Sequence, residues 1–221
     1  MKKYGFYVSG KAGRLHKFLQ FLSDRDDGET IDQLAVVVSD SPETDHLADL
    51  LKQHHIAYKA VNINTFAREV RNLQLSNEIL SAFEQHRVDY GFVFGSRILK
   101  GPLLTRYRDR LINFHPSVLP AFKGLNAIDS ALRDRAFLLG NTAHFIVEEL
   151  DAGPVIMQHL LHHRHFRDYE EILDHQIHML YQIIRWINED RLYIDNGYAH
   201  VRDADYTINE YIPRLEFVRV E

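Results

Sequence analysis

The chain has 221 residues, with 26 lysines and arginines against 31 aspartates and glutamates, so its formal charge is −5 when the 14 histidines are neutral. This acidic balance argues against a nucleic-acid-binding protein, and 45% hydrophobic residues predict a folded protein with a sizeable core. The absence of cysteine excludes disulfides, thiolate metal sites and cysteine nucleophiles, and it fits a reducing cytoplasm. The histidines leave metal binding and proton transfer open as functions.

The first apolar stretch, Tyr4–Val8, is too short for a signal peptide, and it contains a glycine. No apolar run approaches the roughly 18 residues that a membrane span requires. We therefore expect a cytoplasmic protein that is not bound to a membrane.

Short β-branched or aromatic runs alternate with longer segments of helical period over the first two-thirds of the chain, which is typical of βαβ units. The predicted strands are Tyr4–Val8, Leu34–Ser39, Tyr58–Val61, Tyr90–Phe94 and Leu111–His115. The predicted helices between them are Arg14–Leu22, Glu43–His55 and Phe66–His86. The fold class is therefore α/β, with a doubly wound, mostly parallel, Rossmann-like sheet that binds ligands beyond the carboxyl ends of its strands.

The last third of the chain has a different pattern. A helix is expected at Leu125–Asp134, an antiparallel pair of strands at Thr142–Val147 and Pro154–Leu161, and a long helix at Tyr169–Asn188. Two short strands around Asn196-Gly197 predict a hairpin in the tail. We expect one domain over residues 1–192, with a tail of residues 193–221 packed on it.

The turn after the first predicted strand contains Gly10, Lys11, Gly13 and Arg14. Exposed N–H groups at a helix start, beside two cations, suit an anionic group such as a phosphate. The spacing matches neither the dinucleotide fingerprint nor the P-loop, and a simple tight turn is an equal alternative.

The segment from Asn113 to Gly124 is the strongest chemical signal. Asn113 and His115 alternate on the fifth predicted strand, so both side chains face the same side, and two prolines shape the loop that follows. An imidazole beside a carboxamide can move a proton and stabilise an oxyanion, which acyl transfer to an amine requires. A histidine that is simply bonded to a backbone carbonyl is the structural alternative. A second segment, from Gly140 to Pro154, places Asp151 in a turn where it could orient His115.

The two segments together resemble a known family. Asn-x-His-Pro-Ser-x-Leu-Pro from Asn113, Gly-x-Thr-x-His from Gly140 and Leu-Asp-x-Gly-Pro-x-Ile from Leu150 are similar to the 10-formyltetrahydrofolate-dependent formyltransferases. The resemblance extends from Tyr4 to Leu192, and size and layout are most similar to the members that formylate phosphoribosylglycinamide.

The resemblance implies formyl transfer from 10-formyltetrahydrofolate, as co-substrate, to a primary amine, without a metal. It implies that Asn113 donates to the oxyanion, that His115 assists proton transfer and that Asp151 orders His115 and a water, with His144 supporting the active-site strand. The residues that it implies for binding the pterin ring are Arg97, Ile98, Leu99, Val147, Glu148 and Leu150.

This sequence differs from the family pattern at positions that are expected to contact the acceptor. Ala12-Gly13-Arg14 stand where the family has a serine and an asparagine for a phosphate, and Ser96 replaces a methionine. Ile177 beside His178 replaces a glutamate that holds ribose hydroxyls. The implied acceptor contacts are Gly10, Lys11, Gly13, Arg14 and Ser96. The acceptor is expected to be a small, phosphorylated amine: phosphoribosylglycinamide of purine biosynthesis first, and a nucleotide-linked amino sugar as the alternative. A catalytically silent folate-binding regulator is the alternative from another class.

A cluster of histidines near the second antiparallel strand raises a metal hypothesis. It comprises His159, His162, His163 and His165. A strand would point them to both faces, and no carboxylate lies in their register, so we expect a partly solvated strand end and no metal site.

Overall fold

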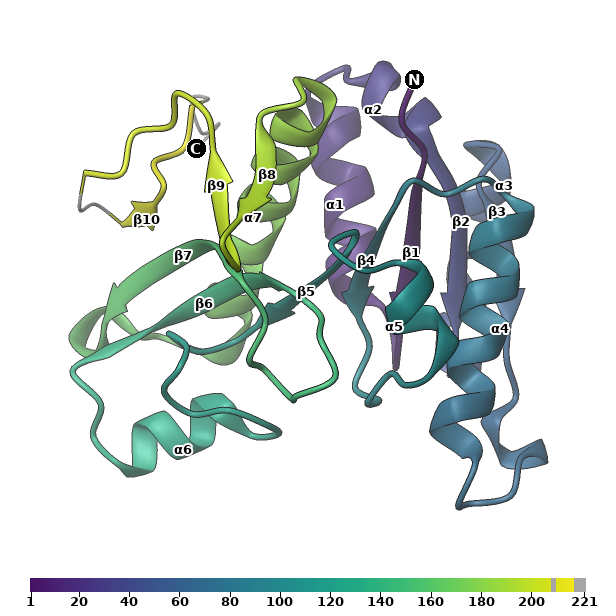
Figure 1. The fold of residues 1–221 in the computed structure, drawn as a ribbon, viewed down its shortest axis with the longest axis horizontal. Coiled ribbons are helices and arrows are strands. Elements are labelled where there is room, and N and C mark those ends of the chain that lie inside the picture. Colours follow the sequence, from purple (N-terminus) through teal and green to yellow (C-terminus); the bar gives the residue numbers. More distant parts are fainter. Residues whose placement is uncertain (208–209, 217–221) are drawn as a thin grey trace. The chain divides into compact units, whose positions relative to one another are not determined.

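The computed structural model describes residues 1–207 and 210–216 of the chain. The chain folds as two compact units, Met1–Ile112 and Asn113–Glu221. Strand β5 (Leu111–His115) begins in the first unit and ends in the second. Figure 1 labels the elements of both units.

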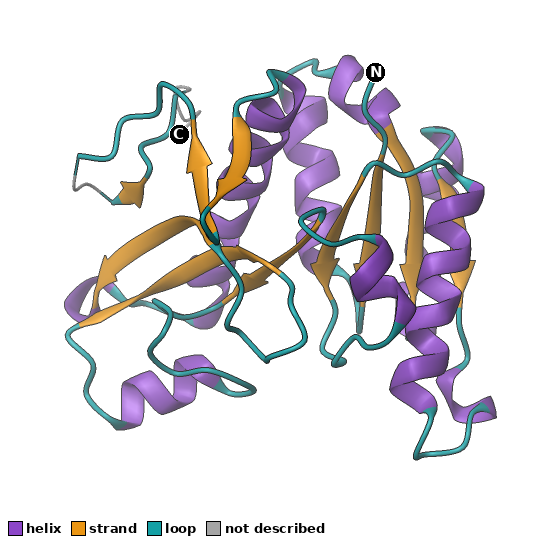
Figure 2. Cartoon of the chain, in the orientation of Figure 1, coloured by secondary structure: helices purple, strands orange, loops and turns teal. Residues whose placement is uncertain are grey.

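The first unit alternates strands and helices as the sequence pattern predicts (Figure 2). Its elements are β1 (Tyr4–Val8), α1 (Gly13–Asp24), α2 (Gly28–Gln33), β2 (Leu34–Ser39), η1 (Pro42–Leu47), α3 (Ala48–Gln53), β3 (Ala57–Ala60), η2 (Ile63–Thr65), α4 (Arg71–Gln85), β4 (Tyr90–Phe94) and α5 (Pro102–Arg106). The strands are parallel, in the order β3-β2-β1-β4. Because parallel strands end at one edge, the residues that follow β1, β2 and β4 lie at the same edge of this sheet.

Helices α1 and α4 contribute apolar faces to the core of the first unit. Four leucine and phenylalanine side chains of α1 are buried, and α4 buries five small or apolar residues, Leu75, Ser76, Ile79, Ala82 and Phe83. The rings of Phe6 and Phe92, on neighbouring strands, lie 5.4 Å apart between centroids. Because both faces of the sheet are covered, the sequences of its central strands are continuous apolar runs.

The second unit contains an antiparallel pair and a long helix. Its elements are the end of β5, α6 (Ala127–Arg133), β6 (Leu138–Phe145), β7 (Val155–His162), η3 (His163–His165), α7 (Tyr169–Asn188), β8 (Leu192–Asp195), β9 (Tyr198–Val201) and β10 (Tyr211–Ile212). Strands β6 and β7 are antiparallel, as predicted, and β10 pairs antiparallel with β7. The expected hairpin at Asn196-Gly197 joins β8 and β9.

Helix α7 has the predicted bounds and packs on β6 and β7. The Asp168 side chain accepts from the Glu171 N–H and caps its first turn, and Trp186 is fully buried in the core of this unit. Among the described helices, none is long and apolar enough to cross a membrane.

Several predicted bounds are wrong by a few residues. The helix predicted over Glu43–His55 is divided into η1 and α3, and its first part is held by the buried Thr44 hydroxyl, which donates to the Gly10 carbonyl. The helix predicted from Phe66 begins at Arg71, because Phe66 has extended backbone with ψ of 142°.

Other strand bounds differ, and short helices were missed. Strand β3 lies one residue before its predicted position, and β6 begins at Leu138 rather than Thr142. Two short helices, α2 and α5, were not predicted, since each is too short to show a helical period.

Candidate active site

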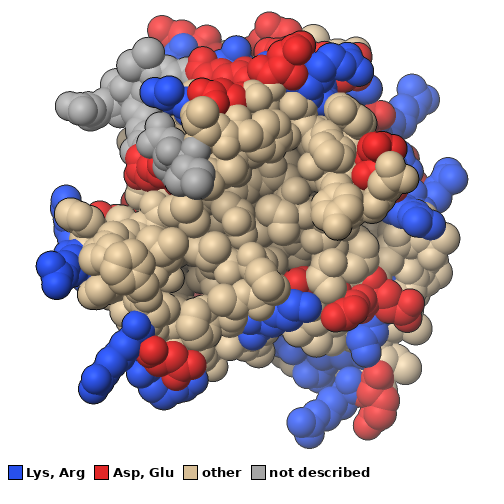
Figure 3. Space-filling view, turned by 60° about the vertical axis from the view of Figure 1, so that its left-hand side comes forward, with Lys and Arg blue, Asp and Glu red and all other residues tan. Residues whose placement is uncertain are grey.

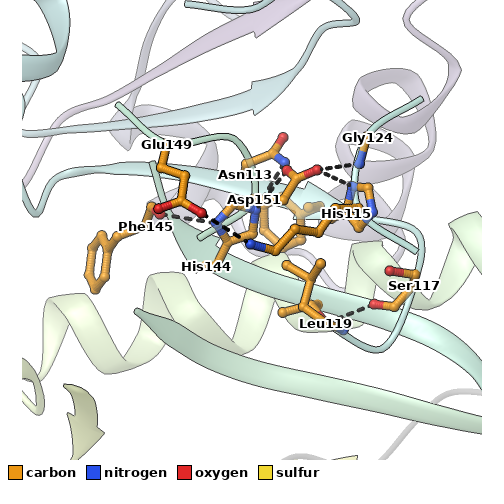
Figure 4. A network of polar contacts seen from close by, with 12 residues as sticks. Asn113, His115, Ser117, Leu119, Gly124, His144, Phe145, Glu149 and Asp151 are labelled. Atoms are coloured by element: carbon orange, nitrogen blue, oxygen red, sulfur yellow. Dashed lines mark hydrogen bonds and ion pairs between the residues drawn. The ribbon is translucent and has the colours of Figure 1, made fainter. Parts of the chain in front are cut away.

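The side chains of the catalytic prediction come together within the second unit (Figure 4). Asn113 and His115 lie on β5, His144 lies near the end of β6, and Asp151 lies in the turn between β6 and β7. Separations of about 30 residues in sequence thus become direct contacts.

His115 is buried and has a polar partner at each ring nitrogen. Its Nε2 lies 2.8 Å from the carbonyl oxygen of Phe122, and its Nδ1 lies 3.4 Å from Oδ2 of Asp151. A carbonyl only accepts, so Nε2 carries a proton and donates it. Nδ1 is therefore the nitrogen of His115 that faces the carboxylate.

Asp151 is buried and has a left-handed backbone conformation in the β6–β7 turn. Its φ of 50° is left-handed, a conformation in which aspartate is several-fold enriched. Its Oδ2 accepts from the Gly124 N–H at 2.8 Å, and its Oδ1 lies 3.6 Å from Nε2 of His144. A side chain at Gly153, two residues later, would place Cβ 1.8 Å from the Phe145 carbonyl oxygen, so the turn requires glycine there.

His144 orients the carboxamide of Asn113. The Nδ1 of His144 donates to the Phe145 carbonyl at 3.0 Å, and its Nε2 accepts from Nδ2 of Asn113 at 3.2 Å. Burial lowers the pKa of His144 and outweighs the nearby Phe145 carbonyl and Asp151 carboxylate, both of which raise it. A neutral His144 is the form that this arrangement requires, because a protonated Nε2 would face the N–H of Asn113.

Two polar side chains of the antiparallel pair, Thr142 and Gln158, hold the loop after β5 in place. The Thr142 Oγ1 donates to the Ser117 carbonyl at 2.7 Å and accepts from the Leu119 N–H at 3.0 Å. Gln158 on β7 donates to both Thr142 Oγ1 and the Leu119 carbonyl. These bonds position the loop so that the Phe122 carbonyl bonds to His115 and the Gly124 N–H bonds to Asp151.

This arrangement has the parts for an acyl transfer. A carboxamide nitrogen carries two hydrogens, so the bond to His144 leaves Asn113 a second N–H for a developing oxyanion. The pair of His115 and Asp151 can hold and exchange a proton in a site sheltered from water. The partners Phe122 and Gly124 were not found from the sequence, since they act through backbone groups.

The residues of the second unit that are expected to bind the pterin ring directly precede Asp151 in the sequence. Val147 is half-buried, whereas Glu148 and Leu150 are exposed at the β6–β7 turn. The neighbouring Glu149 forms an ion pair of 3.5 Å with Lys123 of the loop after β5 (Figure 4). The two segments that flank the catalytic residues therefore contact each other.

The remaining expected residues lie in the first unit. Gly10 has a φ of 58°, Lys11 is exposed, and Gly13 begins α1. The Arg14 guanidinium donates to the Phe94 carbonyl at 2.9 Å and stacks 4.6 Å above the Phe94 ring. Arg14 is thus held against the end of β4.

The segment after β4 exposes most of its side chains. Ser96, Arg97 and Ile98 are exposed, whereas Leu99 is buried. Arg97 forms an ion pair with Asp40, with 3.3 Å between Nε and Oδ2. Asp40 was not among the predicted site residues, and its position directly after β2 was the only feature of the sequence that could have indicated it. The structure thus groups the expected residues in two sets, one within each unit.

The expectation of a partly solvated histidine cluster is wrong for His159. This side chain is fully buried, with its ring stacked at 3.7 Å on the ring of His175 from α7, and a carboxylate, Glu210, lies 3.6 Å from its Nε2. Ligand atoms of these three residues lie within 4.8 Å of one another. Stacked rings direct their in-plane lone pairs side by side rather than toward one ion, and Nδ1 of His159 faces the Asn141 amide N–H₂. This geometry favours a hydrogen-bonded packing cluster.

Figure 3 shows a broad area of uncharged residues with acidic and basic side chains around it. Acidic side chains gather at the top of this view, whereas the basic side chains lie in several separate groups. Among the described residues on this face, the basic side chains do not form the continuous stripe that is typical of nucleic-acid-binding surfaces.

Comparison with known proteins gives consistent matches. The sequence pattern described as formyl transferase matches residues 2–183. Phosphoribosylglycinamide formyltransferase from Bacillus subtilis is 30% identical over 189 residues, which cover 81% of this chain and 89% of that protein. Formyltetrahydrofolate deformylase from Haemophilus influenzae is 32% identical over 131 residues, 58% of this chain and 45% of that protein. The human trifunctional purine biosynthetic protein adenosine-3 is 29% identical over 152 residues, and the match spans 68% of this chain but 14% of that protein.

A solved structure has the same fold. Glycinamide ribonucleotide transformylase 1 from Symbiobacterium toebii superposes with a TM-score of 0.75 and 25% identity over 92% of this chain and 95% of that chain. The predicted α/β, mostly parallel fold is therefore confirmed. With the family pattern covering most of the sequence, this chain belongs to the formyl transferase family and is a formyltransferase enzyme.

Proposed function

We propose that this chain transfers a formyl group from 10-formyltetrahydrofolate to a primary amine, with Asn113, His115 and Asp151 as its catalytic residues. The observation that carries the proposal is the buried cluster in which Asn113 and His115 each contact a partner from the β6–β7 region, His144 and Asp151 respectively. A silent folate-binding regulator would have no need for this pair of oriented contacts.

Asn113 stabilises the charge that develops on the formyl oxygen. The amine nitrogen attacks the formyl carbon and forms a tetrahedral intermediate whose oxygen is negative. The second N–H of Asn113 donates to that oxygen, while His144 holds the carboxamide in place. A donor that is oriented before the reaction contributes most in a site sheltered from water.

His115 and Asp151 manage the proton. The attacking amine loses one proton, and N10 of the folate gains one as its bond to the formyl carbon breaks. Because the Phe122 carbonyl holds Nε2, Nδ1 of His115 is the nitrogen that exchanges this proton, directly or through a water. Asp151 stabilises the protonated ring 3.4 Å away.

The residues that we propose for contacts with the donor's ring are Arg97, Ile98 and Leu99, which follow β4, and Val147, Glu148 and Leu150 of the β6–β7 turn. Support for a folate donor comes from the relative that is named formyltetrahydrofolate deformylase.

Phosphoribosylglycinamide is the first acceptor that we propose, which would place the enzyme in purine biosynthesis. The relative from Bacillus subtilis and the neighbour from Symbiobacterium toebii are named for this substrate. The proposed contacts are Gly10, Lys11, Gly13, Arg14 and Ser96. Arg14 donates to the Phe94 carbonyl, and Lys11 is the exposed cation of this loop. The second candidate is a nucleotide-linked amino sugar, because Ala12-Gly13-Arg14 depart from the family pattern for the phosphate of the first acceptor.

Turnover with a panel of acceptors tests the function. Purified protein is given 10-formyltetrahydrofolate with phosphoribosylglycinamide, with amino-sugar nucleotides or with buffer alone, and tetrahydrofolate and formate are measured. We expect tetrahydrofolate without free formate when phosphoribosylglycinamide is present. If tetrahydrofolate is released only with amino-sugar nucleotides, the acceptor is an amino-sugar nucleotide instead of phosphoribosylglycinamide. If formate is released with buffer alone, the protein is a deformylase. If tetrahydrofolate is not released in any arm, the result supports the silent regulator.

His115→Ala tests the catalytic assignment in the same assay. We expect kcat to fall by about a hundredfold or more while the affinity for the donor stays close to that of the wild type, since the ring acts on the proton in the transition state. His165→Ala, at an exposed histidine of η3, is the matched control. Full activity in His115→Ala would remove this residue from the mechanism.

A further inference from the structure

A polar network joins the ends of three adjacent strands in the first unit. Val8, the last residue of β1, is paired in register with Ser39 of β2 and with Phe94 of β4. The residues that follow, among them Ser9 and Asp40, therefore leave the sheet at the same level, where parallel sheets bind ligands.

The Ser9 hydroxyl is at the centre of this network. It donates to Oδ1 of Asp40 at 2.6 Å, accepts from the backbone N–H of Ser96 at 3.2 Å and lies 3.3 Å from the Tyr7 hydroxyl. The Ser9 hydroxyl has one proton, which it donates to Asp40, so the Tyr7 hydroxyl is the donor in its contact with Ser9. Burial and the Asp40 carboxylate raise the pKa of Tyr7, so its phenol keeps its proton. The direction of each bond around Ser9 is thus determined.

Asp40 connects this buried network to an exposed segment. Its side chain is only 4% exposed, and its Oδ2 lies 3.3 Å from Nε of Arg97, whose side chain is 39% exposed. One carboxylate therefore holds the segment after β4 at two points: the Ser96 backbone, through Ser9, and the Arg97 guanidinium directly. Hydrogen bonds to a charged acceptor are stronger than neutral ones.

A close backbone approach keeps the same segment against β1. A side chain at Gly95 would bring its Cβ within 2.1 Å of the Tyr7 ring. Glycine at this position lets the end of β4 pass over the ring whose hydroxyl supports Ser9.

We propose that Asp40 is a positioning residue for the donor-binding segment Ser96–Leu99. The inference depends on the proposed function, in which the backbone of this segment binds the folate ring. Ser96 and Arg97 are exposed, so the segment would otherwise lose conformational freedom when the donor binds. Ordering it in advance reduces that entropy loss, and the effect therefore appears in the affinity for the donor.

Two substitutions separate the contacts that Asp40 makes. Asp40→Ala removes both, whereas Asp40→Asn retains an oxygen for Ser9 and loses the charge that faces Arg97. We expect Asp40→Ala to raise the donor KM by about tenfold or more and Asp40→Asn to raise it less, with kcat within about twofold of the wild type in both. The dissociation constant of 5-formyltetrahydrofolate, measured by calorimetry as a non-reacting probe, should rise in parallel.

A double-mutant cycle distinguishes positioning from general damage. If Asp40 acts through Arg97, Asp40→Ala should raise the donor KM less in an Arg97→Ala background than in the wild type. Asp45→Asn is the matched control, because Asp45 lies shortly after Asp40 in the chain but its carboxylate accepts a hydrogen bond from the Tyr58 hydroxyl. It should leave the donor KM unchanged.

The outcomes separate this inference from the proposed function. An unchanged donor KM and probe affinity in both Asp40 variants would overturn the inference while wild-type turnover still supported the function. A fall in kcat with no change in either KM would also overturn it. If Asp40→Ala does not fold, as judged by circular dichroism, Asp40→Asn and Ser9→Ala carry the test. A wild-type protein that neither turns over nor binds the probe would contradict the function itself.

Discussion

At the scale of single residues, the tautomer of His144 is determined by its surroundings. The Phe145 carbonyl accepts from Nδ1, so Nε2 carries the lone pair that the Asn113 carboxamide meets. His144 thus orients the carboxamide of Asn113, the proposed oxyanion donor, and it does so only while its ring is neutral.

The lowered pKa of His144 predicts a pH-dependent stability. In the unfolded chain this ring titrates near its ordinary value of 6.5, whereas burial keeps it neutral in the folded protein to lower pH. Below pH 6.5 the unfolded state therefore binds more protons, and the free energy of unfolding should fall as the pH falls. Urea unfolding between pH 7.5 and 5.5 measures this slope.

His144→Gln gives the contrast for that measurement. Its amide oxygen can accept from Asn113, but it does not titrate, so the slope below pH 6.5 should be shallower than in the wild type. His200→Gln, on β9, serves as a control with the same change of side chain. Equal slopes in the wild type and His144→Gln would show that this ring is not the group responsible.

At the scale of elements, the β6–β7 turn determines where Asp151 points. The register of the pair shifts between Ala143 and His144, and the turn brings the Gly153 backbone against the Phe145 carbonyl. The close approach leaves no room for a β-carbon, so the shape of this turn depends on one glycine.

Gly153→Ala is expected to damage both stability and activity. The new β-carbon would be 1.8 Å from the Phe145 oxygen, so the turn must shift and move Asp151 away from His115. We expect a loss of more than about 1 kcal/mol, which lowers Tm by about 2–4 °C or more, together with a reduced kcat. Calorimetry and the turnover assay give the two values.

Gly28→Ala is the control for backbone entropy. A β-carbon at Gly28, in α2, would meet nothing within 4 Å, so this variant should be neutral or slightly stabilised. If Gly153→Ala behaved like Gly28→Ala, the close approach would not constrain the turn.

At the scale of the whole molecule, the described part of the tail belongs to the second unit. Strand β10 pairs with the edge of β7, and Tyr211, only 3% exposed, contacts the His159 ring and accepts or donates a hydrogen bond with Nδ1 of His175. The Glu216 N–H donates to Oε1 of Gln182 on α7. Covering an edge strand in this way also blocks pairing with other chains.

Tyr211→Ala tests whether the tail stabilises the fold. Removing a buried aromatic ring costs about 3–5 kcal/mol in cores, so we expect a clearly lower Tm and aggregation that increases with protein concentration. Tyr198→Ala, at a side chain that is 71% exposed, should change Tm little. A Tm in Tyr211→Ala equal to that of the control would show that the strand is dispensable.

The sequence by itself determined the class of the fold and the bounds of β1, β2, β4, β5 and α7, and it singled out the segments of the proposed catalytic residues. These follow from local periodicity and from residue types that chemistry restricts, such as Asn113, His115 and Asp151. The short helices α2 and α5 could not be predicted in this way because they are too short to show a helical period.

Only the tertiary structure decided how the site is held together. The partners of His115 are a backbone carbonyl and a carboxylate 36 positions away, and Asp40 after β2 reaches Arg97 after β4 across the intervening strand β1. His159, expected at a solvated strand end, is instead buried against α7 and the tail. Such contacts depend on strand order and burial, and a linear pattern of residue types contains neither.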